Sequence, residues 1–150
     1  FDGTADGLSV DALTSAAGTK SVYAVVDPTP ASGYQALFDS FVGRALVGIL
    51  PSGQWGMFDV ADRSSGITAT SGLQRVTFQA GTGASRVWVG GTAGTATSWG
   101  AASAIGTNSA IGGRYVPNAL FYKGHILFLA IYTAARNTAV EDYITQEWGV

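Results

Sequence analysis

Cysteine is absent from the 150-residue sequence and histidine occurs once, which excludes disulfides and thiolate chemistry and leaves too few ligands for a typical transition-metal site. Charged residues are also scarce, at 12 % against the ordinary ~25 %. The net charge of −2 provides no electrostatic footprint for nucleic acid or anionic lipid. No apolar run approaches the ~18 residues that a membrane span requires. The sequence therefore predicts neither a nucleic-acid partner nor membrane insertion.

Glycine, hydroxyl-bearing residues and aromatic residues are abundant instead. The chain has 21 Gly, 28 Ser or Thr, and 47 % hydrophobic residues that include four Trp, six Tyr and seven Phe. This content predicts a packed body rather than disorder, and the length fits one domain over residues 1–150. Because no Met opens the chain, we expect a mature product or a domain excised from a larger protein. The neutral, hydroxyl-rich surface suits an extracellular or virion-surface protein that contacts neutral polymers.

Short strand-like segments alternate with turn signals, which is the pattern of a β-sandwich or barrel. Val76 and Phe78 alternate with polar neighbours, so we expect a strand with one buried and one polar face. Residues 90–110 are mostly Gly, Ala, Ser and Thr around Trp99, which predicts a long loop with at most one short strand. The predicted strands are residues 8–10, 21–26, 35–41, 45–50, 54–60, 75–79, 86–89, 110–114 and 126–131.

The C-terminal part predicts a buried strand followed by one amphipathic helix. Residues 126–131 are apolar on both faces, as expected for a central strand that is covered on both sides. Either Thr133 or Asn137 is a suitable N-cap for the helix, and Gly149 is a natural residue to follow its end. Four residues form one helical stripe that must dock on the β-rich body: Val140, Tyr143, Ile144 and Trp148.

Five segments, spread over nearly the whole chain, carry a resemblance to one fold family. They are the Asp-Gly opening at residues 1–6, Arg86-Val87-Trp88-Val89 followed by Gly-Gly, Ile111-Gly112-Gly113-Arg114, a Gly-x-Ile strand that ends in Ile131-Tyr132, and the closing helix. In order and spacing they resemble the laminin-G-like, concanavalin A-like lectin and glucanase jelly rolls appended to secreted bacterial proteins and to phage tail or virion proteins. The resemblance implies an all-β, two-sheet antiparallel jelly-roll sandwich with one C-terminal α-helix.

Glycoside hydrolysis is the enzymatic activity to test for such a fold, and it usually needs two carboxylates ~5 to 9.5 Å apart across a cleft. The only glutamates, Glu141 and Glu147, both lie on the predicted helix. Asp59 and Asp62 are three residues apart, which places them on opposite faces of a regular strand, and we interpret them as strand-end and turn residues. His125 is interpreted as a packed or edge histidine. We therefore expect no enzymatic activity.

Calcium is the cofactor that the sequence leaves open, because hard cations take carboxylates and backbone carbonyls from loops. The best candidate ligands are Asp2 with Asp6, or Asp59 with Asp62. The alternative, which we favour, is that these aspartates cap turns through Asx hydrogen bonds.

Sugar binding needs an exposed aromatic ring and a few polar groups for the hydroxyls. Trp148 belongs to the helix stripe and is expected in the core, whereas Trp88 shares a strand face with Arg86 and is expected to be partly exposed. The candidate ligand-binding residues are Tyr34, Trp55, Asp59, Trp99, Arg114 and Tyr115. The alternative for Trp55 and Trp99 is that they anchor loops in satellite cores.

Together these features predict a non-catalytic carbohydrate-binding or adhesion module of a phage structural or secreted bacterial protein, with cell-surface polysaccharide or glycan as its receptor. The alternative is a structural virion decoration or assembly domain that contacts other domains or subunits of a larger assembly. Exposed aromatics on the concave sheet would favour the first function, and a flat apolar patch would favour the second.

Overall fold

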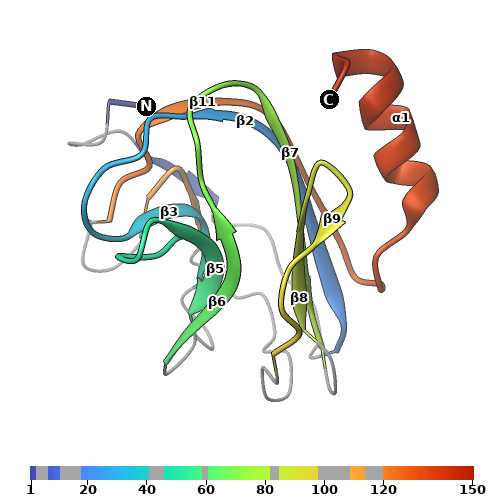
Figure 1. The fold of residues 1–150 in the computed structure, drawn as a ribbon, viewed down its shortest axis with the longest axis horizontal. Helices are drawn as coiled ribbons and strands as arrows, with labels where there is room; N and C mark the ends of the chain where they lie inside the picture. Colours follow the sequence, from blue (N-terminus) through green and yellow to red (C-terminus); the bar gives the residue numbers. More distant parts are fainter. Residues whose placement is uncertain are drawn as a thin grey trace.

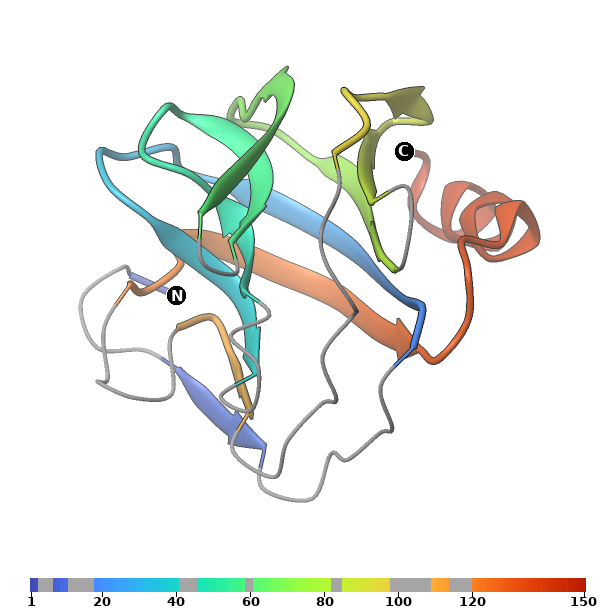
Figure 2. The same ribbon diagram turned by 90° about the horizontal axis from the view of Figure 1, so that it is seen from below.

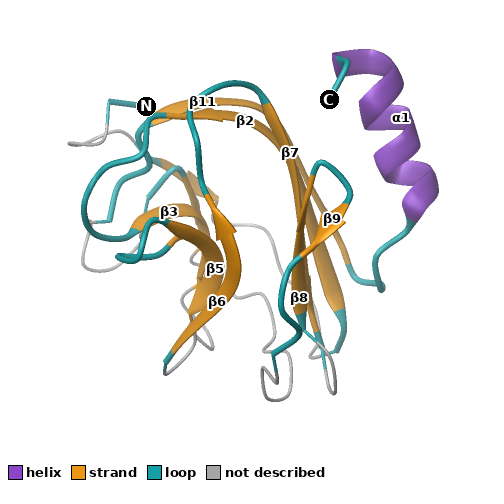
Figure 3. Cartoon of the chain, viewed as in Figure 1, coloured by secondary structure: helices purple, strands orange, loops and turns teal. Residues whose placement is uncertain are grey.

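The computed structural model describes residues 1–2, 7–10, 18–40, 46–58, 61–81, 85–97, 109–113 and 120–150. These residues form two sheets and one helix (Figure 1, Figure 3). In spatial order, the six-stranded sheet contains β1 (Leu8–Val10), β10 (Ser109–Ile111), β3 (Gln35–Ser40), β4 (Leu46–Ile49), β5 (Gln54–Phe58) and β6 (Asp62–Thr68). The five-stranded sheet contains β11 (Gly124–Tyr132), β2 (Lys20–Pro28), β7 (Gln74–Ala80), β8 (Arg86–Val89) and β9 (Thr92–Ala93). All of the described strand pairs are antiparallel.

The main core lies between the two sheets. Along β2, Val22, Ala24 and Val26 join this core, whereas Tyr23 and Val25 belong to a second cluster on the opposite face. This alternation follows from the two-residue period of a strand, which sends successive side chains to opposite faces. Figure 2 shows β2 and β11 running side by side. The expected all-β, two-sheet antiparallel jelly-roll sandwich with a C-terminal helix is therefore confirmed.

Helix α1 (Thr138–Trp148) covers the outer face of the five-stranded sheet. Figure 1 shows it on the side of β2, β7 and β8 that faces away from β3, β5 and β6. Ile144 is fully buried against Tyr23 and Val25 of β2. Tyr143, which we expected in the docking stripe, is 56 % exposed, and Glu141 is buried in its place.

The ends of α1 follow local capping rules. The side chain of Asn137 accepts a hydrogen bond from the Ala139 N–H, so Asn137 rather than Thr133 is the N-cap. Gly149 has the left-handed conformation, with φ of 70°, and its N–H donates to the Thr145 carbonyl. Both features match the sequence-based expectations for a helix that begins after Asn137 and stops before Gly149.

A buried charged network joins α1 to the sheet. Arg136 forms an ion pair with both carboxylate oxygens of Glu141, and Thr77 Oγ1 donates to Glu141 Oε1 at 2.7 Å. Arg75 donates to the Glu141 carbonyl at 2.9 Å. Burial alone would raise the pKa of Glu141, but the hydrogen bonds from Arg136 and Thr77 outweigh it and hold that pKa below its ordinary value. The polar face of β7 is therefore covered by the helix rather than exposed to solvent.

Strand β11 differs from the prediction of a central strand covered on both faces. It stands at one end of the five-stranded sheet as described, and most of its residues are only partly buried. Leu127 is 41 % exposed and Tyr132 is 45 % exposed. The apolar run arises because one face of β11 packs into the core through Ile126, Leu129 and Ile131, while Phe128 packs beside the helix.

Two further strands, β6 and β9, form in segments whose residue pattern is weak for a strand. β6 was not predicted, because its residues are mostly polar and Gly66 interrupts them; it pairs with β5 nonetheless. Asp62 therefore opens a strand instead of lying in a turn. β9 is a short strand within the described part of the Gly-rich segment. None of the helices formed by the described residues is long and apolar enough to cross a bilayer.

Candidate functional site

Only part of the candidate site lies within the described residues. Tyr34, Trp55, Asp2 and Asp62 can be placed. The other candidates lie outside the described residues: Asp6, Asp59, Trp99, Arg114 and Tyr115.

Trp55 is a core residue. Its side chain is 0 % exposed, and its ring meets Phe78 edge-on at a centroid distance of 6.1 Å. The indole Nε1 donates to Gln74 Oε1 at 2.9 Å, so its polar group is satisfied inside the protein. Because no ring surface is available for a ligand, the expectation that Trp55 binds sugar is corrected in favour of the core alternative. Strand β5 directs the ring inward.

Asp2 forms an isolated bridge with Lys123 and is exposed. Its proposed calcium partner, Asp6, lies outside the described residues. Among the residues that the structure places, no group of three or more His, Asp or Glu side chains is arranged to hold a metal ion. Calcium binding by Asp2 with Asp6, or by Asp59 with Asp62, therefore stays a prediction, because one aspartate of each pair lies outside the described residues.

Tyr34 lines a pocket of about 310 Å³ at one end of the sandwich, which we call the Tyr34 pocket. The turn between β2 and β3 forms one wall, and the segment leading into β11 forms the other. The lining residues are Ala31, Ser32, Gly33, Tyr34, Gln35, Leu120, Phe121 and Lys123. The lining therefore includes two aromatic residues, Tyr34 and Phe121, together with the polar residues Ser32, Gln35 and Lys123.

The Tyr34 ring is held in place from two directions. Its hydroxyl donates to Asp62 Oδ1 at 2.7 Å, and its ring meets Phe58 edge-on at 5.7 Å between centroids. The hydrogen bond to Asp62 is the main cause of a raised pKa for Tyr34, with burial and the Asp62 charge adding to it. The hydroxyl thus stays protonated, and the ring is positioned before any ligand arrives.

The back of the Tyr34 pocket is built from backbone that is tightly constrained. Gln35 is 2 % exposed, and its side-chain oxygen accepts from the Lys123 N–H at 3.1 Å. A Cβ at Gly48 would lie 2.1 Å from the Gln35 carbonyl oxygen, so only glycine fits behind it. Leu120 has a φ of 58°, a conformation that side-chain-bearing residues rarely adopt, and its carbonyl accepts from the Ala36 N–H. Such strain persists where surrounding contacts impose it.

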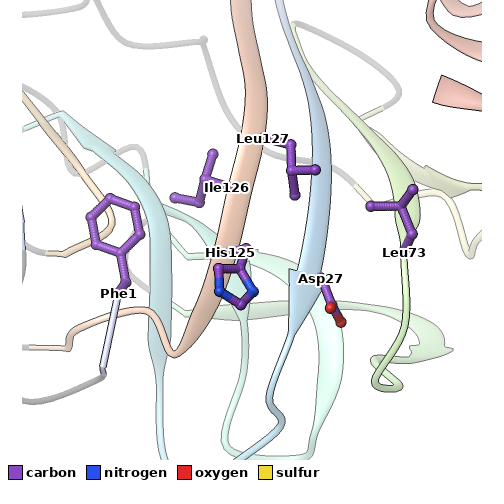
Figure 4. A pocket seen from close by; sticks show the side chains of 6 residues that line it. All are labelled: Phe1, Asp27, Leu73, His125, Ile126 and Leu127. Carbon is purple, nitrogen blue, oxygen red and sulfur yellow. The ribbon is translucent and has the colours of Figure 1, made fainter. Parts of the chain in front are cut away.

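A second pocket, of about 370 Å³, opens beside β11 and β2, and we call it the outer pocket (Figure 4). It is lined by Phe1, Asp27, Leu73, His125, Ile126 and Leu127. In Figure 4, Phe1 and Leu73 stand at opposite ends, with β11 and β2 between them. The lining is mainly apolar, and Asp27 and His125 supply its ionisable side chains.

Asp27 and His125 are direct cross-strand partners, which brings their side chains to the same face. Asp27 Oδ1 accepts from the Gly72 N–H at 2.9 Å, and His125 is exposed. Gly124 makes this approach possible, because a Cβ there would lie 2.2 Å from the Asp27 carbonyl oxygen. The sequence analysis interpreted His125 as a packed or edge histidine and did not single out Asp27. Only the pairing of β2 with β11 shows that the two residues meet.

The described carboxylates do not form a facing pair in either pocket. Glu141 is buried beneath α1, and Glu147 is exposed on the same helix. The Tyr34 pocket has Asp62 only at the tyrosine hydroxyl, and Asp27 alone lines the outer pocket. Within the described residues, the geometry therefore suits binding through aromatic, apolar and hydrogen-bonding groups.

Three solved structures show what this chain is similar to. Domain 4 of a GH43 extracellular arabinanase from Geobacillus stearothermophilus, in complex with arabinotriose, matches with a TM-score of 0.69 at 18 % identity, over 93 % of this chain and 71 % of that one. The CBM40 of the Ruminococcus gnavus IT-sialidase, bound to α2,3 sialyllactose, matches with a TM-score of 0.65 at 15 % identity, over 87 % of this chain and 83 % of that one. A Trypanosoma rangeli sialidase in complex with sialic acid matches with a TM-score of 0.59 at 16 % identity, over 87 % of this chain but 23 % of its own.

No protein-family model matches the sequence, and no curated protein does either. At these sequence identities, the likeness to the solved structures establishes the β-sandwich jelly-roll fold alone.

Proposed function

We propose that this protein is a non-catalytic carbohydrate-binding module that recognises cell-surface polysaccharide. The observation that carries the proposal is the likeness, over most of the chain, to two domains whose structures hold arabinotriose or sialyllactose. Fold alone does not fix function, so the proposal also needs a site with suitable chemistry. An extracellular or virion-surface location, and a parent protein of the phage structural or secreted bacterial kind, belong to the same proposal.

The Tyr34 pocket is the proposed glycan site. A sugar ring has apolar C–H faces and a rim of hydroxyls, so it needs an aromatic surface and hydrogen-bonding groups close together. Tyr34 supplies the fixed ring, and Ser32 and Lys123 supply a hydroxyl and an ammonium group at the same opening. Because the ring is already held by Asp62 and Phe58, little side-chain freedom is lost when a sugar binds.

Substitution of Tyr34 tests this site. We expect Tyr34→Ala to weaken binding of a glycan that the wild-type protein recognises by about fivefold or more, because an aromatic contact contributes roughly 1 kcal/mol. Tyr34→Phe keeps the ring and loses only the Asp62 hydrogen bond, so it should retain most of the affinity. Isothermal titration calorimetry of the three proteins with an oligosaccharide found on a glycan array measures the difference.

Tyr143→Ala is the matched control, because Tyr143 is exposed on α1 and lines neither pocket. If wild type, Tyr34→Ala and Tyr143→Ala bound the glycan with equal affinity, Tyr34 would not be part of the glycan site. The same assay applies to Asp59, Trp99, Arg114 and Tyr115, which stay proposed ligand contacts. Titration with and without a chelator tests the calcium prediction for Asp2 and Asp6.

The alternative function is a structural decoration or assembly domain that acts through protein contacts. Leu73 and Leu127 favour it, because they are 43 % and 41 % exposed and line the same pocket. Binding to no glycan, together with a concentration-dependent sedimentation coefficient that Leu127→Ser abolishes, would support the alternative over the carbohydrate-binding module.

A further inference from the structure

We propose that the outer pocket is a second sugar subsite that selects the acetamido group of an N-acetylated amino sugar. This inference rests on the proposed carbohydrate-binding function and adds the class of glycan. It follows from an unusual combination in one pocket: a mainly apolar lining, one carboxylate and one imidazole (Figure 4).

The apolar part of the pocket matches a methyl group. Leu73 and Leu127 are large side chains left about two-fifths exposed, at 43 % and 41 %. Ile126 and Phe1 complete this lining, and both also pack against the main core. A sugar that carries only hydroxyls would place polar groups against these side chains, which is unfavourable unless the hydroxyls find partners. An acetamido methyl would instead remove apolar surface from water.

The polar part of the pocket matches the amide of the same group. One oxygen of Asp27 accepts from the Gly72 N–H, and the other has no hydrogen-bond partner among the described residues. That oxygen can accept the amide N–H of the sugar. His125 lies directly across the strand pair and is exposed, so a ring N–H can donate to the acetyl carbonyl. One acetamido group thus satisfies both side chains and the apolar lining.

The charge of the pocket selects against acidic sugars. Asp27 is a carboxylate, and the lining includes no Lys or Arg. A uronic or sialic acid carboxylate would therefore meet the like charge of Asp27 without a Lys or Arg side chain in the lining to offset it. A neutral acetamido sugar carries no charge, so Asp27 does not repel it.

The backbone builds this pocket in advance. The register of β11 against β2 shifts between Ile126 and Phe128, so Leu127 is the extra residue of a β-bulge. Bulges re-aim side chains and are frequent next to functional sites. Gly124, with φ of 127°, brings the start of β11 against the backbone at Asp27 and Pro28. The positions of His125 and Leu127 therefore do not depend on a ligand.

Three tetrasaccharides with the same β1,4-linked backbone test the inference: chitotetraose, its fully deacetylated form and cellotetraose. They carry an acetamido group, an amine or a hydroxyl at the same position of each ring. We expect chitotetraose to bind the wild-type protein at least tenfold more tightly than cellotetraose in calorimetry. In ¹H–¹⁵N spectra, chitotetraose should shift the amide signals of Leu73, His125 and Leu127.

Two variants link that preference to the pocket. Leu127→Ser and His125→Ala should each reduce chitotetraose affinity toward that of cellotetraose. Leu8→Ser is the matched control, because Leu8 is 58 % exposed on the other sheet. Unchanged melting temperatures would show that the effect is on binding rather than on folding.

The outcomes separate this inference from the function on which it rests. Equal binding of chitotetraose and cellotetraose, or a preference that both variants retain, would overturn the acetamido subsite while the module still binds glycan. Tightest binding of the deacetylated form would also overturn it, and would favour recognition of a cation by Asp27, such as a lysine side chain of a partner. If the protein bound no glycan on an array, the proposed carbohydrate-binding function itself would be overturned.

Discussion

At the scale of single residues, Tyr122 and Tyr23 are two fully buried tyrosines with opposite hydrogen-bond status. The Tyr122 hydroxyl has no partner among the described residues, and burial, together with the charge of Asp27, raises its pKa. The Tyr23 hydroxyl accepts from the Asn137 N–H at 2.6 Å. A buried polar atom without a partner loses its hydration and gains nothing in return.

Removal of each hydroxyl should therefore have opposite effects on stability. We expect Tyr122→Phe to leave the free energy of unfolding unchanged or to raise it by up to about 1 kcal/mol, and Tyr23→Phe to lower it by about 1 kcal/mol or more. Urea denaturation of both variants measures the two changes. A clear loss of stability in Tyr122→Phe would mean that the hydroxyl has a partner in the folded protein.

A second prediction at the scale of single residues concerns the effect of substituting Gly124 on stability. A Cβ there would lie 2.2 Å from the Asp27 carbonyl oxygen, so Gly124→Ala should lower the free energy of unfolding by about 3 kcal/mol and distort the outer pocket. Gly33→Ala is the control: Gly33 also has positive φ, at 90°, but no atom lies within 4 Å of the added methyl. Its cost should be only about 1 kcal/mol. Equal melting temperatures for the two variants would contradict the predicted clash.

At the scale of elements, the docking of α1 depends on Glu141 as well as on Ile144. The lowered pKa of Glu141 means that its ionised form is favoured by folding. Its contribution to stability is therefore fully present above the unfolded-state pKa of about 4.3, and it is lost as the pH falls through the lower folded-state pKa. Removal of one partner from a buried ion pair costs roughly 3–5 kcal/mol, and the partial exposure of Arg136 places this pair at the lower end of that range.

We expect Glu141→Gln to lower the melting temperature at pH 7 and to reduce the difference in stability between pH 7 and pH 3. Thermal unfolding followed by circular dichroism at several pH values measures both effects. Glu147→Gln is the control, since Glu147 is exposed on the same helix. If Glu141→Gln lost as much stability on acidification as the wild type, another carboxylate would be responsible for the pH dependence.

Prediction from the sequence was correct where local chemistry determines the structure. Asn137 and Gly149 delimit α1 because their side-chain and backbone preferences act within one helical turn. It failed where packing between distant segments decides which residues form strands and which faces of a strand are buried. β6 is stabilised by pairing with β5 despite its polar residues, and β11 is apolar on both faces because the core covers one face and α1 part of the other.

The same distinction applies to the candidate site. Tyr34 could be chosen from its loop-like context, and it does line a pocket. Trp55 had a similar context, but the register of β5 places its ring in the core. Asp27 and His125 could not be paired from the sequence, because they are far apart along the chain and meet only through the register of β2 with β11.

At the scale of the whole molecule, the sandwich separates stabilising and binding features. The core lies between the sheets, and α1 with its charged network covers one outer face. The Tyr34 pocket and the outer pocket both include residues of the segment around the start of β11, so they lie near each other along it.

The most direct test of the carbohydrate-binding function is a glycan array, together with whole cell-wall polysaccharide, probed with the purified wild-type protein in the presence of calcium and of a chelator. The account predicts saturable binding to a restricted set of neutral or N-acetylated glycans, weakened by Tyr34→Ala. Binding to no glycan under either condition would contradict it and leave the structural or assembly domain as the better account.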